Sequence, residues 1–292
     1  MPIKICKNFV RQYLKKILNN ENERFGFVYY GKMKNSSIDT SSTGERKNLE
    51  SIVKTLNLDK GFCVDIGAND GFSNSCTLGL FSNSWRGLAI EINPKKFATL
   101  SYLYKSFENV TLLKLGIQPR NILKVFEACN VPQKFEVLNI DIDSYDLEVV
   151  STILEHYRPK IITMEINEKI VPGIFFSVRF AEDHIFRGDH FFGASISAVC
   201  EVIKPKNYKL WKVVYNNAFF IDAEVCNDLI IDLPSLEAWR IGYKEAQDRE
   251  KLFHFNSDVD YWMNLEPTYA IREINKIFKI YSGKYDIRLS SY

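Results

Sequence analysis

The chain has 292 residues, of which 46% are hydrophobic and 25% are charged, a composition typical of globular proteins that bury a core of their own. Its 38 basic and 36 acidic side chains leave a net charge of +2, so no overall electrostatic field favours nucleic acid or an anionic membrane. These values exclude a disordered, a collagen-like and a repeatedly membrane-spanning chain.

The cysteines and the N-terminal residues indicate a cytoplasmic protein. The six cysteines form no C-x-x-C pair and no Cys/His cluster with zinc spacing, so we expect reduced thiols. Residues 1–20 lack the apolar centre of a secretory signal, and no stretch approaches 18 uninterrupted apolar residues, so we expect no transmembrane segment. Residues 3–18 have the pattern of a basic amphipathic helix. We favour packing of this helix on the domain, and peripheral contact with the inner face of a membrane is the alternative.

The order of the predicted elements indicates an α/β fold. Residues 1–58 read as an N-terminal helical segment with a polar linker, and a helical pattern resumes at 45–57. From 59 to 224, short apolar runs alternate with helical patterns, which predicts a mostly parallel sheet with helices on both faces. A short turn at 215–217 predicts an antiparallel hairpin, and residues 225–292 read as a helical extension. The seven expected strands are 62–66, 87–90, 110–115, 135–142, 160–166, 209–214 and 218–221.

A glycine loop directly follows the first expected strand. Residues 64–71 read Val-Asp-Ile-Gly-Ala-Asn-Asp-Gly, and Gly67 and Gly71 allow the backbone to approach a ligand at the carboxyl end of the strand. Asn69 stands where a dinucleotide-binding loop has its second glycine, which disfavours an NAD-dependent enzyme, and no Gly-Lys-Ser/Thr follows as in a P-loop. The loop therefore suits a nucleoside without a pyrophosphate.

An acidic residue ends the second expected strand. Glu91 follows Gly71 by 20 residues, a position where a carboxylate accepts hydrogen bonds from both ribose hydroxyls. The alternative interpretations are a turn-capping role for Asp65 and a solvated strand end for Glu91. Because the two acids stand at successive strand ends beside one glycine loop, their combination favours a nucleoside site.

The glycine loop and the run Trp-Arg-Gly-Leu-Ala-Ile-Glu at 85–91 resemble S-adenosylmethionine-dependent methyltransferases of the Rossmann-like class, and FkbM-like proteins in particular. The resemblance covers about residues 61–222 and continues through Leu-Asn-Ile-Asp-Ile-Asp at 138–143 and Phe-Gly-Ala-Ser at 192–195. It implies a seven-stranded sheet with an antiparallel seventh strand, S-adenosylmethionine as the cofactor and transfer of a methyl group. The cofactor-binding residues that it implies are Asp65, Gly67, Ala68, Asn69, Gly71, Glu91, Ile92 and Asp141.

Polar side chains alternate at the ends of the fourth and fifth expected strands. Asn139, Asp141 and Asp143 share one face of the strand pattern, and Glu165 and Asn167 share a face of the next strand. Three carboxylates that meet at adjacent strand ends need a cation, a proton or a substrate between them. Oxygen ligands suit Mg²⁺ or Mn²⁺, whereas Asp143 alone suits a base that deprotonates an acceptor hydroxyl. A hydrogen-bonded strand terminus without catalytic function is the third interpretation.

Two histidines lie in the segment 182–195, which is expected to overhang the cofactor. We favour His190 over His184 as a general base because His190 adjoins the Phe-Gly-Ala-Ser motif. Arg179 and Arg187 are candidate clamps for a phosphate-like acceptor. The predicted catalytic residues are Asp141, Asp143, Glu165 and His190.

These observations predict an S-adenosylmethionine-dependent O-methyltransferase. By the resemblance, its acceptor is a sugar or phosphate-like group of a surface polysaccharide or its precursor, or another small molecule. The alternative is a non-catalytic scaffold that binds S-adenosylmethionine or a partner in glycan assembly. The aromatic side chains of the C-terminal extension suit an acceptor pocket, a homo-oligomer contact or a plain core; they include Trp239, Tyr243, Trp262 and Tyr269.

Overall fold

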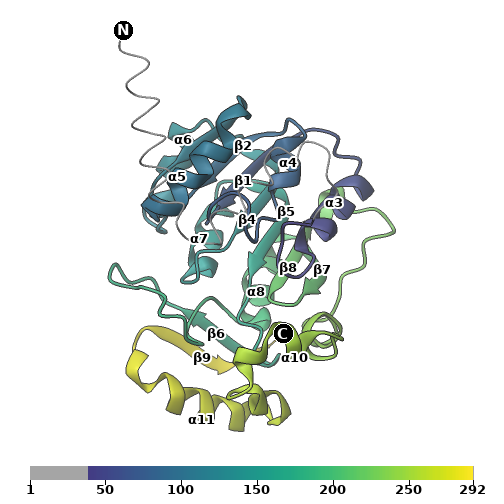
Figure 1. Ribbon diagram of the computed structural model, residues 1–292. Coiled ribbons are helices and arrows are strands. Elements are labelled where there is room, and N and C mark those ends of the chain that lie inside the picture. The colour runs from purple at the N-terminus through teal and green to yellow at the C-terminus, as the bar shows by residue number, and fades with distance from the viewer. Residues whose placement is uncertain (1–38, 292) are drawn as a thin grey trace.

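The computed structural model describes residues 39–291, and the helix expected at 3–18 lies outside the described residues (Figure 1). Its main feature is a seven-stranded sheet with the order β3-β2-β1-β4-β5-β8-β7, in which only β8 runs antiparallel to its neighbours. The strands are β1 (Phe62–Ile66), β2 (Arg86–Ile90), β3 (Val110–Leu113), β4 (Lys134–Ile140), β5 (Arg158–Glu165), β7 (Tyr208–Val214) and β8 (Asn217–Asp222). This sheet confirms the fold class predicted from the sequence.

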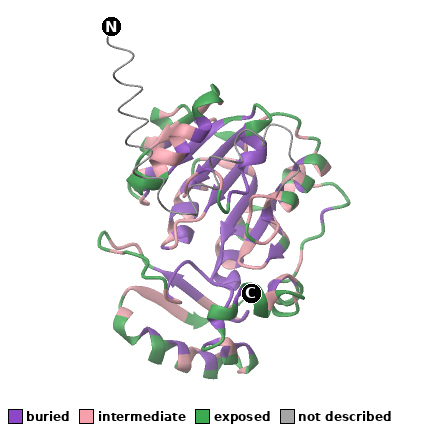
Figure 2. Cartoon of the chain, in the orientation of Figure 1, coloured by how far each residue is buried: buried purple, intermediate pink, exposed green. Residues whose placement is uncertain are grey.

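Helices cover both faces of this sheet, which is why its central strands are apolar on both sides. One buried cluster joins one face to three helices, α3 (Glu45–Thr55), α4 (Leu78–Ser82) and α5 (Pro94–Leu103). The other cluster joins the opposite face to α6 (Ile122–Ala128), α7 (Asp146–Ile153) and α8 (Ile196–Ile203). Figure 2 shows the strands as the most buried part of the molecule. The predicted helix at 45–57 is confirmed as α3.

We had expected a C-terminal extension that is helical throughout, but it also contains a strand. A second sheet pairs β6 (Ile174–Val178) with β9 (Tyr285–Leu289) in antiparallel register. The sequence did not reveal it because the pairing joins segments that lie more than 100 residues apart in the chain. The other elements of the extension are α9 (Ser235–Trp239), the π-helical turn η4 (Arg240–Lys244), α10 (Arg249–Leu252) and α11 (Pro267–Ile277). Short 3-10 turns are η1 (Tyr104–Ser106), η2 (Lys204–Lys206), η3 (Ala223–Val225), η5 (His254–Asn256), η6 (Asp260–Asn264) and η7 (Phe278–Tyr281).

The extension shares a hydrophobic core with the large sheet. Trp239, Tyr243 and Trp262 are buried in the same cluster as β4 and β5. The indole of Trp239 also donates a 2.7 Å hydrogen bond to the carbonyl of Glu168. Three of the four aromatic residues singled out in the sequence are therefore core residues, whereas Tyr269 is exposed.

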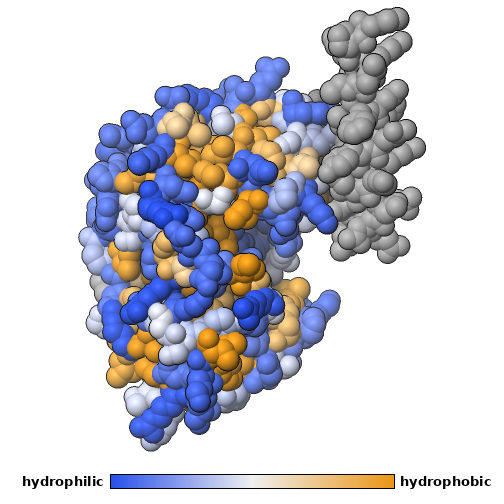
Figure 3. All heavy atoms as spheres, turned by 90° about the vertical axis from the view of Figure 1, so that its left-hand side faces the viewer, coloured by the Kyte–Doolittle hydropathy of each residue, from blue (hydrophilic) through white to orange (hydrophobic). Residues whose placement is uncertain are grey.

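On the face shown in Figure 3, apolar side chains form several groups separated by polar ones. Among the helices of residues 39–291, none combines the length and the apolar character that a membrane crossing requires.

Candidate active site

The glycine loop joins three strands at their carboxyl ends. Gly67 has a φ of +89°, and a Cβ atom there would lie 1.7 Å from the carbonyl oxygen of Asp141. The amides of Gly67 and Ala68 both donate to the carbonyl of Ile90 at the end of β2 (3.0 and 2.9 Å). Only glycine allows this close approach of the chains after β1 and β4.

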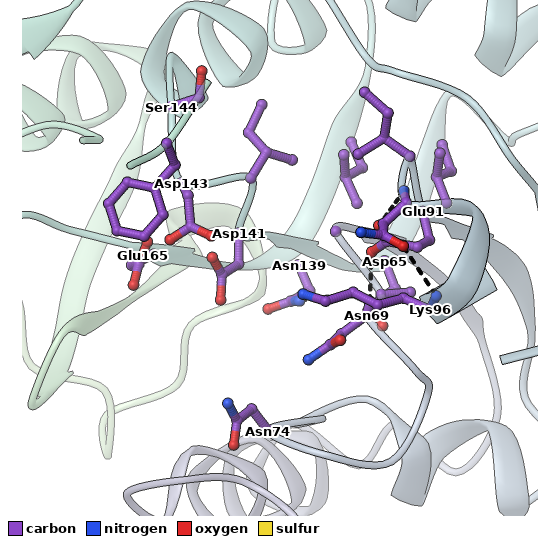
Figure 4. A pocket seen from close by; sticks show the side chains of 18 of the residues that line it. Asp65, Asn69, Asn74, Glu91, Lys96, Asn139, Asp141, Asp143, Ser144 and Glu165 are labelled. Carbon is purple, nitrogen blue, oxygen red and sulfur yellow. Dashed lines mark hydrogen bonds between the residues drawn. The ribbon is translucent and has the colours of Figure 1, made fainter. Parts of the chain in front are cut away.

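A pocket of about 840 Å³ opens where β1, β2, β4 and β5 end (Figure 4). It contains most of the residues that the sequence predicted for the site. Those lining it are Asp65, Gly67, Ala68, Asn69, Glu91, Ile92, Asp141, Asp143 and Glu165. Two predicted residues, Gly71 and His190, do not line it.

Gly71, for which we had expected a ligand contact, is not among the residues that line the pocket and has a structural reason of its own. Its φ is +79°, and a Cβ atom would lie 2.6 Å from Leu100 and 2.8 Å from Tyr104. The missing side chain thus lets the loop pack against α5 and η1. The two glycines of one motif serve different contacts, which spacing alone did not separate.

Glu91 lies between the glycine loop and the start of α5. The residue is 6% exposed, Oε2 accepts a hydrogen bond from the amide of Asn69 (2.9 Å), and Oε1 accepts one from the amide of Asn93 (2.6 Å). Figure 4 shows these contacts at one end of the pocket. Because each carboxylate oxygen has two acceptor sites, Glu91 retains capacity for a ligand hydroxyl.

Asp65 belongs to a row of buried hydrogen bonds beneath the pocket. It accepts from the hydroxyl of Thr77 (2.5 Å) and from Nδ2 of Asn139 (2.8 Å). Asn139 in turn accepts from the hydroxyl of Thr163 on β5 (2.5 Å). Burial raises the pKa of Asp65, and the two hydrogen bonds oppose that shift. The row fixes the spacing of β1, β4 and β5 below the site.

Three carboxyl groups meet at the other end of the pocket. One carboxylate oxygen each from Asp141, Asp143 and Glu165 lies within 4.8 Å of the other two. The sequence predicted this meeting through strand alternation as far as residue 143, but β4 ends at Ile140. Asp143 instead has a left-handed backbone with a φ of +53°. The residues are therefore brought together by a turn and not by a strand face.

Asp146 holds that turn. Its Oδ1 accepts the amide of Ile142 (2.8 Å) and its Oδ2 accepts the amide of Ser144 (3.0 Å). Burial raises the pKa of Asp146 to about 6, against the effect of these amides. A left-handed backbone is costly for a residue other than glycine, so the two bonds stabilise the conformation that directs Asp143 toward its neighbours.

The carboxyl groups of this cluster are poorly compensated. Burial raises the pKa of Glu165 well above its ordinary value, and the negative charge of Asp141 adds to the shift. Burial also raises the pKa of Asp141 well above its ordinary value, and next to burial the charge of Asp143 contributes. For Asp143 burial again raises the pKa, while Lys96 opposes the shift. In the described part of the chain, the ion pairs do not include any of these three acids.

The pocket contains His184 and not His190, whereas we had favoured His190 as the base. His184 lines the pocket, whereas Nε2 of His190 lies 3.1 Å from Asp258, away from the pocket lining. Burial lowers the pKa of His184, which favours a neutral imidazole. Its Nε2 is buried without a hydrogen-bond partner in residues 39–291.

Asn167 explains why His190 is displaced. Because β5 ends at Glu165, the alternation does not extend to Asn167, and its side chain does not join the acidic cluster. Its Nδ2 instead donates to the carbonyls of His190 and Phe192, both at 2.9 Å. Asn167 thus holds the loop that carries His190.

The two arginines considered for a phosphate-like acceptor do not line the pocket. Arg179 binds Asp286 of β9 through two nitrogens, and Arg187 is exposed. Lys96 is the one lysine or arginine among the described residues that line the pocket. The sequence did not single it out, although it follows Glu91 by five residues at the start of α5.

Part of the pocket wall comes from the loop that was expected to overhang the cofactor and from the C-terminal extension, for which an acceptor pocket was one interpretation. Ile185 and Phe186 come from the loop after β6, and Leu252 and Phe255 come from the extension. All four are exposed apolar side chains. Their position beside the cluster depends on tertiary packing, for which no local sequence signal exists.

Replacing Glu165 with glutamine should raise the free energy of unfolding at pH 7, measured by urea denaturation with chelator present. Folding raises the pKa of this carboxyl, so its contribution to stability falls as the pH rises through the folded-state pKa. A gain of ~1 kcal/mol corresponds to less than one pKa unit. The control is Glu45→Gln. Both oxygens of Glu45 accept hydrogen bonds from Thr43, so this variant should be less stable than the parent. A loss of stability in both variants would contradict the electrostatic account of the cluster.

The sequence matches no protein-family model, and no curated protein matches it. Among solved structures, a SAM-dependent methyltransferase from Aquifex aeolicus is 13% identical over 67% of this chain and 97% of its own, with a TM-score of 0.38. A putative O-methyltransferase from Klebsiella pneumoniae is 13% identical over 72% of this chain and 94% of its own, with a TM-score of 0.41. The fold assignment rests on the order and register of the strands in the sheet itself.

Proposed function

We propose that this protein is an S-adenosylmethionine-dependent O-methyltransferase. The observation that carries the proposal is one pocket with Glu91 and the glycine loop at one end and the Asp141–Asp143–Glu165 cluster at the other (Figure 4). Open α/β sheets bind nucleosides at the carboxyl ends of their strands, where this pocket lies. The cofactor end and the reacting end are thus arranged along one cavity.

The charge of the pocket supports a cationic cofactor. S-adenosylmethionine carries a sulfonium, an ammonium and a carboxylate, so its net charge is +1. Seven carboxyl residues line the pocket against one lysine, Lys96. The seven are Glu45, Asp65, Glu91, Asp141, Asp143, Glu165 and Glu182. The same surplus of negative charge disfavours NAD, whose pyrophosphate is anionic.

In the proposed complex Glu91 accepts hydrogen bonds from the two ribose hydroxyls. Its oxygens are already oriented by the amides of Asn69 and Asn93. This preorganisation lowers the entropic cost of binding the ribose. The backbone around Gly67, where no side chain intervenes, is the proposed contact of the methionine part.

The proposed reaction is an in-line displacement at the methyl carbon. The acceptor oxygen forms the new C–O bond as the C–S bond breaks, and the bonding pair remains on sulfur, which becomes a neutral thioether. The acceptor proton passes to the imidazole of His184, which lines the pocket and whose lowered pKa favours the neutral, proton-accepting form. The enzyme supplies alignment and proton removal, since the sulfonium is itself a reactive donor. His184 takes the role for which the sequence had favoured His190.

We propose a neutral hydroxyl, as on a sugar of a surface polysaccharide or its precursor, as the acceptor. An anionic phosphate would face the acidic lining without the arginines once considered for it, because Arg179 pairs with Asp286. The apolar side chains of Ile185 and Phe186 offer a surface for a sugar ring or an attached apolar group. Incubating the protein with isotopically labelled S-adenosylmethionine and matched neutral and phosphorylated sugars tests this choice. Label on the phosphorylated sugars alone would contradict it.

Calorimetric titration with S-adenosylhomocysteine tests the cofactor. We expect saturable micromolar binding, no binding of NAD, and a loss of about 1.5–3 kcal/mol in Glu91→Ala, the usual value of hydrogen bonds to a charged group. Because Glu91 also holds two loop amides, a ribose-deoxygenated analogue provides the control. It should bind the parent more weakly than S-adenosylhomocysteine does, and the two ligands should bind Glu91→Ala equally. Equal loss of both ligands relative to the parent would instead show that Glu91 acts only on the loop.

A further inference from the structure

The cluster of Asp141, Asp143 and Glu165 has the geometry of a cation site. We propose that these three residues bind a divalent metal ion of the Mg²⁺ or Mn²⁺ type. One oxygen from each lies within 4.8 Å of the other two. Neighbouring oxygen ligands of an octahedral magnesium ion lie ~3 Å apart and opposite ones ~4.2 Å apart, so the three oxygens can enter one coordination sphere after side-chain rotations that draw them closer together.

Glu165 provides an independent observation that points to a ligand. The residue is 8% exposed, and its Oε1 accepts a 2.8 Å hydrogen bond from Nδ2 of Asn216. Its Oε2 is buried and has no hydrogen-bond partner in residues 39–291. A buried carboxylate oxygen without a partner is costly, and a bound cation offsets that cost.

No ion pair in the described part of the chain compensates the three acids of the cluster. Lys96 and His184 are the basic side chains among the described pocket residues, and no ion pair within residues 39–291 joins either to the three acids. In Figure 4 the three carboxyl groups gather at one end of the pocket. Oε1 of Glu165 already accepts a hydrogen bond from Asn216, so Glu165 would bind the ion through Oε2 alone. With one oxygen from each of the three carboxylates, the ion keeps open positions for water or an acceptor oxygen, as is usual for Mg²⁺.

The ion would act on the acceptor and not on the cofactor. Resting on the proposed function, a hydroxyl bound to the cation loses its proton more readily, and the ion fixes its oxygen in line with the methyl group. The proton still passes to His184, so the balance of the reaction is unchanged. A hard cation that prefers oxygen ligands also favours an acceptor with neighbouring hydroxyls, as in a sugar diol.

Titration of the full chain with Mn²⁺, followed by water-proton relaxation and by thermal unfolding, tests the site directly. We expect one saturable Mn²⁺ per chain and a rise in the unfolding temperature with Mn²⁺ concentration. Glu165→Gln and Asp143→Asn should each weaken Mn²⁺ binding at least tenfold. Glu45→Gln, which removes a pocket carboxylate outside the cluster, should bind Mn²⁺ within about twofold of the parent.

Parallel titration of S-adenosylhomocysteine, with and without chelator, separates this inference from the proposed function. Binding of S-adenosylhomocysteine together with absent Mn²⁺ binding would overturn the metal site and leave the methyltransferase proposal intact. Mn²⁺ binding that is equally strong in Glu165→Gln and Asp143→Asn would also overturn it. Mn²⁺ binding without any S-adenosylhomocysteine binding would support the metal site and contradict the proposed function.

Discussion

Replacing Asp143 with asparagine should reduce methyl transfer by roughly 10²–10⁴, the usual contribution of assisted proton removal, because Asp143 is a proposed ligand of the ion that makes the acceptor hydroxyl more acidic. Asparagine keeps the shape and the tolerance for the left-handed backbone at this position, where φ is +53°, but it removes the charge. The affinity for S-adenosylhomocysteine should stay within about twofold, because Glu91 lies at the other end of the pocket (Figure 4). Single-turnover rates with the acceptor found in the sugar screen provide the measurement.

The matched control for this substitution is Asp258→Asn. Asp258 is 69% exposed on its side chain and pairs with His190, and neither residue lines the pocket. Both Asp258→Asn and His190→Ala should transfer methyl groups at rates close to the parent. An Asp143→Asn variant with the parent rate would make the acidic cluster a structural feature and remove it from the reaction.

Replacing Gly67 with alanine should have the largest effect on folding. The added Cβ would lie 1.7 Å from the carbonyl oxygen of Asp141, and the φ of +89° is itself unfavourable for alanine. Because the contact is with backbone, relief requires the ends of β1 and β4 to move apart. We expect a loss of about 3 kcal/mol or more in the free energy of unfolding, measured with urea, together with loss of cofactor binding.

Gly188→Ala separates the two causes of that loss. Gly188 also has a positive φ, +72°, but a Cβ atom there meets nothing within 4 Å. Its substitution should cost only about 1–2 kcal/mol, the cost of the left-handed conformation alone. If Gly67→Ala were no more destabilising than Gly188→Ala, the close approach at Asp141 would have no energetic weight.

Much of the sheet was predictable because buried parallel strands are short apolar runs bounded by turns. All seven predicted strands of the large sheet exist, and each boundary lies within two residues of the prediction. The hairpin of β7 and β8 was predicted from a three-residue turn, which is local information. The sheet of β6 and β9 was not, since its pairing depends on segments far apart in the chain.

The site was predictable to the extent that strand ends determine it. Glu91 and Asp141 follow directly from the strand order, and both line the pocket. Asp143 reaches the cluster through a turn that Asp146 stabilises. The alternation of side chains along a strand predicted its position correctly, but β4 ends at Ile140 and Asp143 is not part of a strand. His184 and His190 are six residues apart in one loop, and contacts distant in the chain, those of Asn167 with the loop backbone and of Asp258 with the imidazole, accompany the position of His190 outside the pocket lining.

A crystal structure of the complex with S-adenosylhomocysteine tests the central claim most directly. We predict that both ribose hydroxyls lie within hydrogen-bond distance of the Glu91 carboxylate. The sulfur should face the cluster of Asp141, Asp143 and Glu165, with room between them for an acceptor oxygen. A complex in which the ligand occupies another part of the molecule, or lies in this pocket with its sulfur directed away from the three carboxyl groups, would contradict the account.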